Sequence, residues 1–210
     1  MRKRLTAVLL SSGAAALALA MSTTAATASN ITATWSVSPG GNFSFSGSGQ
    51  VKDATTGTIA KCTSMKLSGT LKSGHGLSGT GLGTIKTASF TGCTIATVAI
   101  TVTTHGLPWK ENASSFNATT GVTTGNISGI DLVATAPGCS ATLDGTAAGA
   151  NNGKTKITYT NSTGKIKLLG SGGNLHSFAV SGCFGLVNNG DVQKASGSGT
   201  VTPKQTITSP

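Results

Sequence analysis

The sequence predicts an all-β protein, an antiparallel β-sandwich or barrel of about ten short strands. Along most of the chain, apolar and polar residues alternate with the two-residue period of half-buried strands. Thr, Val and Ile, which suit a pleated surface, are separated by frequent Gly and Asn residues typical of turns. Aromatic residues make up only 4% of the chain. We therefore expect a core built mainly from Val, Ile, Leu, Ala and Thr methyl groups.

The N-terminal segment has the pattern of a secretory signal peptide over residues 1–28. Basic residues at 2–4 precede an apolar stretch at 5–20, and Ala-Thr-Ala at 26–28 supplies the small-residue cleavage pattern. The apolar stretch is shorter than the roughly 20 residues that span a bilayer as a helix. We expect residues 29–210 to form a secreted all-β domain with no transmembrane segment.

Several strands can be predicted individually. The strongest alternation runs over 94–103, where we expect one continuous half-buried strand. The clearest hairpin joins 154–160 to 165–169 through Asn-Ser-Thr-Gly at 161–164. Its inward-facing residues are predicted to be Ile157, Tyr159, Ile166 and Leu168. Further strands are expected at 31–37, 42–48, 84–90, 122–133, 175–180 and 198–201.

Four cysteines in an exported chain favour two disulfides over free thiols, although three connectivities are open. Two segments resemble each other: one begins CTSMKLSGT and closes SFTGC, and the other begins CSATLDGT and closes AVSGC. This likeness favours one disulfide in each segment, Cys62 with Cys93 and Cys139 with Cys183. It also suggests two related β units, an internal duplication of 31–106 and 107–202. A zinc site is not expected, because no C-x2-C pair occurs.

The charge of the mature chain is strongly basic and comes from lysine alone. The mature chain contains twelve lysines and five acidic residues, and no arginine follows the leader. Arginine is the preferred bidentate reader of phosphate and guanine, so nucleic acid is not an expected partner. The lysines are scattered, which is typical of a solvated surface. An anionic cell-wall polymer or membrane surface remains an expected type of partner.

No motif for catalysis, metal or cofactor binding is present. The chain has no G-x-S-x-G or G-D-S-G-G serine motif, calcium loop, phosphate loop or dinucleotide fingerprint. A Ser-His-Asp hydrolase would need His105 or His176 to meet Asp131 or Asp144 in one cleft, while His75 is expected in an exposed turn. The sequence therefore favours a non-enzymatic role without a cofactor, and a secreted hydrolase remains an alternative.

Exposed aromatic side chains are the basis of another alternative, a carbohydrate-binding module. Trp109 lies in the run GLPWKEN, predicted as non-strand, and with Trp35 or Tyr159 it could form a platform for sugar stacking. The competing interpretation is that these rings are needed for packing.

The chain also resembles a family of secreted actinobacterial proteins of uncharacterised function. The segments that carry this resemblance include THGLPWKENASSFNATTG, ITYTNSTGKIKLLGSGG and the ending VTPKQTITSP. The resemblance implies export and brings no activity or site residues. We expect a secreted or cell-wall-associated β protein with a structural or binding role.

Overall fold

The computed structural model describes residues 34–210, so the predicted signal peptide lies outside the described residues. Within them the chain forms fifteen β-strands and no helix. The strands are β1 Thr34–Ser38, β2 Gly41–Asp53, β3 Ile59–Leu71, β4 Gly74–Ser78, β5 Gly83–Ile95, β6 Val98–Ala99, β7 Thr101–His105, β8 Trp109–Asn117, β9 Val122–Ala136, β10 Cys139–Asp144, β11 Gly153–Thr160, β12 Lys165–Leu169, β13 His176–Ser181, β14 Gln193–Thr202 and β15 Thr206–Thr208. The all-β prediction is confirmed.

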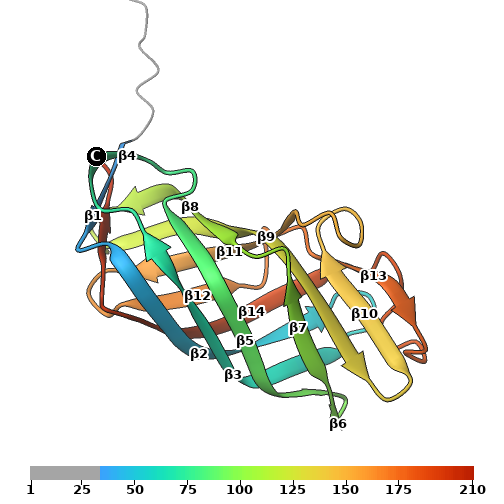
Figure 1. Ribbon diagram of the computed structural model, residues 1–210. Helices are drawn as coiled ribbons and strands as arrows, with labels where there is room; N and C mark the ends of the chain where they lie inside the picture. Colours follow the sequence, from blue (N-terminus) through green and yellow to red (C-terminus); the bar gives the residue numbers. More distant parts are fainter. Residues whose placement is uncertain (1–33) are drawn as a thin grey trace, which may run out of the picture. The chain divides into compact units, whose positions relative to one another are not determined.

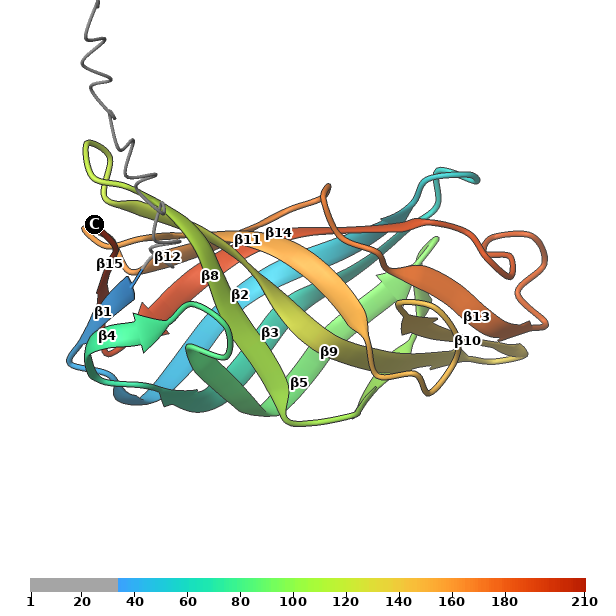
Figure 2. The same cartoon turned by 90° about the horizontal axis from the view of Figure 1, so that it is seen from above.

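Eight strands close into one antiparallel barrel. The order around the barrel is β2, β3, β5, β8, β9, β11, β12 and β14, and β14 pairs with β2 to complete the circuit. The barrel strands therefore follow one another in chain order, as in an up-and-down barrel. Figures 1 and 2 show these strands curving around a common interior.

Two smaller assemblies lie at opposite ends of the barrel (Figure 1). At one end, β1 pairs with β15 and β4 in a separate three-stranded sheet. At the other, the second half of β9 leaves the barrel and pairs with β7 and β10, and β10 pairs with β13. Gly129, at φ +88°, lies where the register of β9 against β11 shifts. This β-bulge bends β9 out of the barrel wall.

Both predicted disulfides are confirmed. Cys62 and Cys93 are direct partners across β3 and β5, with their Cα atoms 4.0 Å apart. Cys139, at the start of β10, pairs with Cys183 just after β13, at a Cα separation of 4.5 Å. Three barrel strands come from 31–106 and five from 107–202. The internal duplication stays a prediction.

The hairpin predicted around 161–164 is confirmed as β11 and β12. Ile157 faces Leu168 and Tyr159 faces Ile166 across this pair. Ile157, Tyr159 and Ile166 are buried in the core, and Leu168 is partly buried against it. The alternation of β-branched and polar residues therefore indicated the correct faces.

Two predictions about strand boundaries are wrong. The strand expected at 94–103 is broken, because Ala96 and Thr97 adopt positive φ (44° and 76°) and form a tight turn between β5 and β6. Such two-residue turns usually carry Asn or Gly, and neither residue occurs at 96–97, so the residue pattern does not indicate this turn. Conversely, the run GLPWKEN is not a loop throughout, since β8 begins at Trp109 directly after Pro108.

Candidate ligand-binding cavities in the barrel

The barrel interior contains a cavity of about 150 Å³ at the end that carries both disulfides. Eight-stranded barrels have an interior just wide enough to be filled by side chains or to hold one small ligand. In this barrel, many inward-facing side chains are too small to fill the interior. Apolar residues make up most of the lining, including Phe45, Met65, Leu67, Phe90, Ile95, Val102, Trp109, Ile127, Ile130, Leu132, Leu143 and Leu175 with Ala60, Ala134, Ala141 and Ala195.

Small residues in β2 and β14 explain why space remains at this end. Gly47 and Gly199 are partners across these strands, and the Phe45 ring lies against both, because a Cβ at either would come within 3 Å of it. Two residues further along β2, Gly49 has no such ring over it and lines the cavity. Ala195 and Ala60 continue the small lining on β14 and β3.

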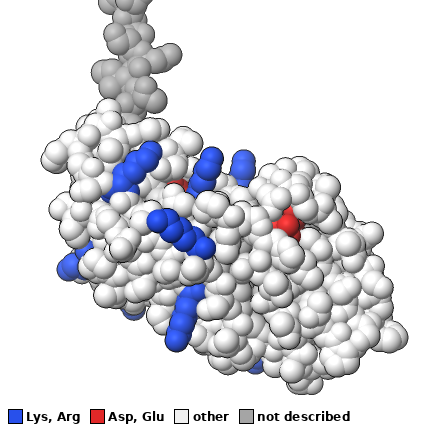
Figure 3. Space-filling model, in the orientation of Figure 1, with Lys and Arg blue, Asp and Glu red and all other residues white. Residues whose placement is uncertain are grey.

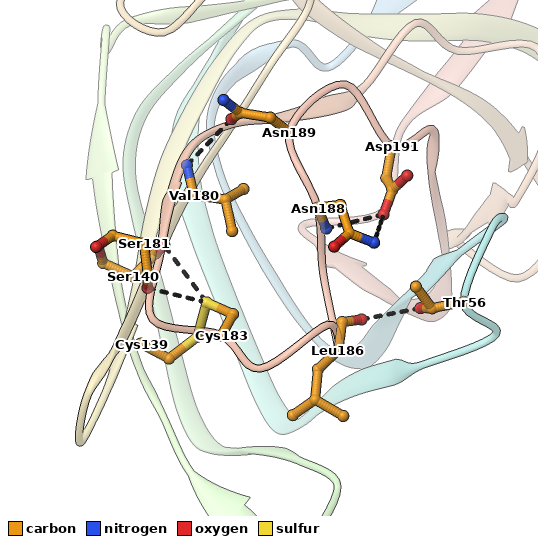
Figure 4. Close-up of a disulfide and its surroundings, with 10 residues drawn as sticks. All are labelled: Thr56, Cys139, Ser140, Val180, Ser181, Cys183, Leu186, Asn188, Asn189 and Asp191. Carbon is orange, nitrogen blue, oxygen red and sulfur yellow. Dashed lines mark hydrogen bonds between the residues drawn. A yellow bond between two sulfur atoms is a disulfide. The ribbon is translucent and has the colours of Figure 1, made fainter.

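A loop over residues 182–192, which we call the covering loop, borders the cavity through Val187. Cys183 anchors its first part to Cys139, and Thr56 Oγ1 donates a hydrogen bond of 2.8 Å to the Leu186 carbonyl (Figure 4). Within the loop, the Asn188 backbone N–H donates to Asp191 Oδ2 at 2.8 Å. The second disulfide therefore holds a cavity-bordering loop in place.

The barrel wall has a seam beside the cavity. Among the described residues, β5 and β7 form no ladder of backbone hydrogen bonds, although they are neighbours in space. The Ile100 N–H donates to the Cys93 carbonyl at 3.0 Å, and Thr104 Oγ1 reaches the Ala88 carbonyl at 3.5 Å. Phe90 and Val102 line the cavity from these two strands. Few hydrogen bonds therefore hold β5 and β7 together beside the cavity.

One polar side chain of the first cavity has unused hydrogen-bonding capacity. Ser177 Oγ on β13 is fully buried, lines the cavity and has no hydrogen-bond partner among the described residues. By contrast, the Gln193 amide, which also lines the cavity, donates to Asp53 Oδ2 at 2.8 Å. Ser177 is therefore a buried, unpaired hydroxyl that an enclosed molecule could meet.

A second cavity of about 50 Å³ lies further along the same strands, toward the three-stranded sheet. On β2 and β8, Phe43 and Glu111 line this second cavity, and Phe45 and Trp109, two positions away, line the first. Glu111 is half-buried, and burial raises its pKa from 4.5 to about 7. The sequence did not single out Glu111, because the run that contains it was predicted to be non-strand.

The three aromatic residues proposed as a sugar platform lie in the core. Trp35, Trp109 and Tyr159 are 2%, 3% and 4% exposed. Trp109 Nε1 donates to the His105 carbonyl at 3.1 Å, and Tyr159 Oη donates to the Gln205 carbonyl at 2.8 Å. None of the three rings is exposed on the outer surface to stack on a glycan, and Trp109 and Tyr159 instead border the two cavities.

The histidines and aspartates do not assemble into a catalytic triad within residues 34–210. The strand register places His105 opposite Asp131 and His176 opposite Asp144, but no hydrogen bond or ion pair joins either pair. Asp144 instead accepts backbone N–H bonds from Gly145 and from 151–153. The serine–histidine hydrogen bond found among these residues, Ser36 Oγ to His75 Nδ1 at 2.9 Å, is exposed and has no carboxylate partner.

Asp131 is buried beside Asp144, and its Oδ1 has no hydrogen-bond partner among the described residues. Burial raises its pKa, the nearby Asp144 raises it further, and His105 opposes the rise. Within residues 34–210, no group of three or more His, Cys, Asp or Glu side chains is placed to hold a metal ion.

The lysines are all exposed and lie outside the barrel. On the face shown in Figure 3 they stand apart from one another over the barrel strands, and the end formed by β10 and β13 is free of them. Binding to an anionic wall polymer stays a prediction.

No helix within residues 34–210 is long and apolar enough to cross a membrane.

Comparison with known protein families, curated proteins and solved structures gave no match.

Proposed function

We propose that this protein is an exported binding protein that encloses a small, largely apolar molecule in its barrel. The observation that carries the proposal is the cavity of about 150 Å³ with its almost wholly apolar lining. In another protein, an engineered cavity of about 150 Å³ lined by Leu, Ile and Phe stays dry and accepts benzene. By this comparison the ligand has about the size of one aromatic ring.

Export is supported by the leader pattern at 1–28 and by the two disulfides. Disulfides form and persist mainly in oxidising, extracellular compartments. A carrier outside the cell would shield an apolar molecule from water, and the Cys139–Cys183 disulfide would keep the covering loop over it.

Ser177 gives the ligand one polar contact. A buried hydroxyl without a hydrogen-bond partner destabilises the folded protein, and a hydrogen bond with the ligand would remove this penalty. The best ligand class is therefore a single-ring compound with one hydroxyl or carbonyl group. A phenol such as p-cresol is a suitable probe, and toluene is the matched probe that lacks the hydroxyl.

The test is a titration of methyl-labelled protein with p-cresol, followed by NMR chemical shifts. We expect saturable shifts in the wild type. Ala141 lines the cavity and is 6% exposed, so Ala141→Leu should fill part of the space and weaken binding at least about tenfold. Ala118→Leu makes the same change at an exposed position and should bind as the wild type does.

Ser177→Ala separates the polar contact from the apolar enclosure. It should weaken p-cresol binding by about two- to tenfold, as expected for one hydrogen bond, and leave toluene binding unchanged. Binding that Ala141→Leu does not affect would place the ligand elsewhere and overturn the proposal. An absence of saturable shifts in the wild type would overturn it as well.

A further inference from the structure

We propose that Glu111 and the second cavity form a separate binding site for a short alkylammonium ion, whose cationic head contacts the carboxylate and whose alkyl chain fills the apolar space. This site goes beyond the binding of an apolar molecule in the first cavity, because it lies in a different chamber and uses a charged group.

Strand pairing places Glu111 on the inner side of the barrel wall. On β8 it lies two positions from Trp109 and from Ala113, both of which pack with the core. Its direct partners are Gly83 on β5 and Ile127 on β9. Gly83 leaves room for the carboxylate, since a Cβ there would collide with Glu111 Oε2. The side chain therefore lies over a glycine and lines the cavity.

The other polar side chains that line this cavity already have partners. Tyr159 Oη donates to the Gln205 carbonyl and accepts from the Gln205 N–H, both at 2.8 Å. Asn112 Nδ2 donates to Asn126 Oδ1 and Ser128 Oγ, and its Oδ1 accepts from the Gly81 N–H.

The remaining two polar side chains that line this cavity, Thr123 and Gln205, also have hydrogen-bond partners. Thr123 Oγ1 donates to the Ile207 carbonyl at 3.3 Å. Gln205 Oε1 accepts from the Gly40 N–H at 2.8 Å, and its Nε2 donates to the Pro203 carbonyl.

Glu111 alone keeps its full hydrogen-bonding capacity. Among the described residues, no group donates a hydrogen bond to its carboxylate and no lysine forms an ion pair with it. The lysines on the surrounding strands are all exposed: Lys52 on β2, Lys61 and Lys66 on β3, Lys86 on β5, Lys110 on β8, Lys154 and Lys156 on β11, Lys165 and Lys167 on β12, and Lys194 on β14. Tyr159 is the other titratable group that lines the cavity, and its hydroxyl is already paired. An unpaired carboxylate in an apolar space favours a donor that carries positive charge.

The size of the cavity limits the ligand. One water needs roughly 10–15 Å³ by the same measure, so about 50 Å³ accommodates a molecule of roughly four non-hydrogen atoms. Apolar side chains such as Leu71, Leu82 and Ile157 make up most of the wall. Propylammonium matches both the volume and the polarity, and the fold already shields the carboxylate in part from bulk water. The carboxylate is therefore in place before the ligand arrives.

Glu111 is the single glutamate of the sequence, so selective ¹³Cδ-glutamate labelling gives one carboxyl signal to follow. Without ligand, its titration midpoint should lie near pH 7, the value that burial produces. Saturating propylamine should lower the midpoint by at least about one pH unit, because a neighbouring cation favours the ionised carboxylate. The neutral isostere 1-propanol should leave it within about 0.3 unit.

Two variants localise the site by calorimetry with propylamine at pH 8. Glu111→Gln should abolish measurable binding, and Ala113→Leu, which fills the same cavity but keeps the carboxylate, should weaken it at least tenfold. Lys110→Gln, an exposed neighbour on β8, should not weaken it. Equal effects of propylamine and 1-propanol on the midpoint would overturn the proposal. So would propylamine binding that survives Glu111→Gln, or a cavity that takes up water only and leaves the midpoint unmoved. None of these results depends on p-cresol binding in the first cavity.

Discussion

Glu111 should make the stability of this protein depend on pH in a direction opposite to that of most carboxylates. Burial raises its folded-state pKa to about 7 from an ordinary value of 4.5. The native state therefore holds a proton that the unfolded chain releases between these two values. The free energy of unfolding contributed by this group is greatest below pH 4.5, falls as the pH rises toward 7, and is constant above that.

The full difference amounts to about 3 kcal/mol, from about 1.4 kcal/mol per pKa unit, and it is an upper value because Glu111 is only half-buried. Glu111→Gln keeps the shape and removes the charge. At pH 8 the variant should therefore be more stable than the wild type by up to about 3 kcal/mol, and at pH 4.5 the two should be nearly equal.

Urea unfolding of both proteins at pH 4.5, 6, 7 and 8, with the disulfides intact, measures this difference directly. Subtracting the two curves removes the contribution of Asp131, which both proteins share. A difference that stays the same across the pH range, or a variant less stable than the wild type at pH 8, would refute the placement of Glu111 in a water-poor interior.

Three further predictions concern the core, the covering loop and a buried carboxylate. Trp109→Ala should lower the free energy of unfolding by about 3–5 kcal/mol in urea, as for a buried ring, and an unchanged value would contradict its packing role. Replacing both Cys139 and Cys183 by Ala should cost about 4 kcal/mol for a 44-residue span and speed amide hydrogen exchange in 182–192 more than elsewhere. Unchanged exchange there would show that the disulfide does not hold the loop. Asp144→Ala leaves four backbone N–H donors without their acceptor and should cost at least about 3 kcal/mol in thermal unfolding. A loss below about 1 kcal/mol would mean that water replaces the carboxylate.

The fold class and the disulfide pairing could be predicted because local patterns determine them. The hairpin of β11 and β12 followed from alternating apolar residues on both sides of a Gly-containing turn. The pairing of Cys62 with Cys93 and Cys139 with Cys183 followed from two similar segments, each with one cysteine at either end.

The site could not be predicted in the same way, because it depends on contacts between distant strands. The alternation of Trp109, Glu111 and Ala113 is the signal that would have placed Glu111 inside the barrel. The adjacent Pro108 and the polar residues after Trp109 obscure this signal, because they are typical of a loop. The cavity at Gly49 depends on the closure of β14 against β2, about 150 residues apart in sequence, and no local pattern reports it.

The central claim, that the barrel encloses a small apolar molecule, is tested most directly by intermolecular nuclear Overhauser effects between p-cresol and the protein. Cross-peaks are expected from the ring protons to the methyl groups of Met65, Leu132 and Leu143, which line the first cavity. None is expected to Val201 or Ile207, which line the second. Cross-peaks confined to exposed side chains such as Phe184 would contradict the claim.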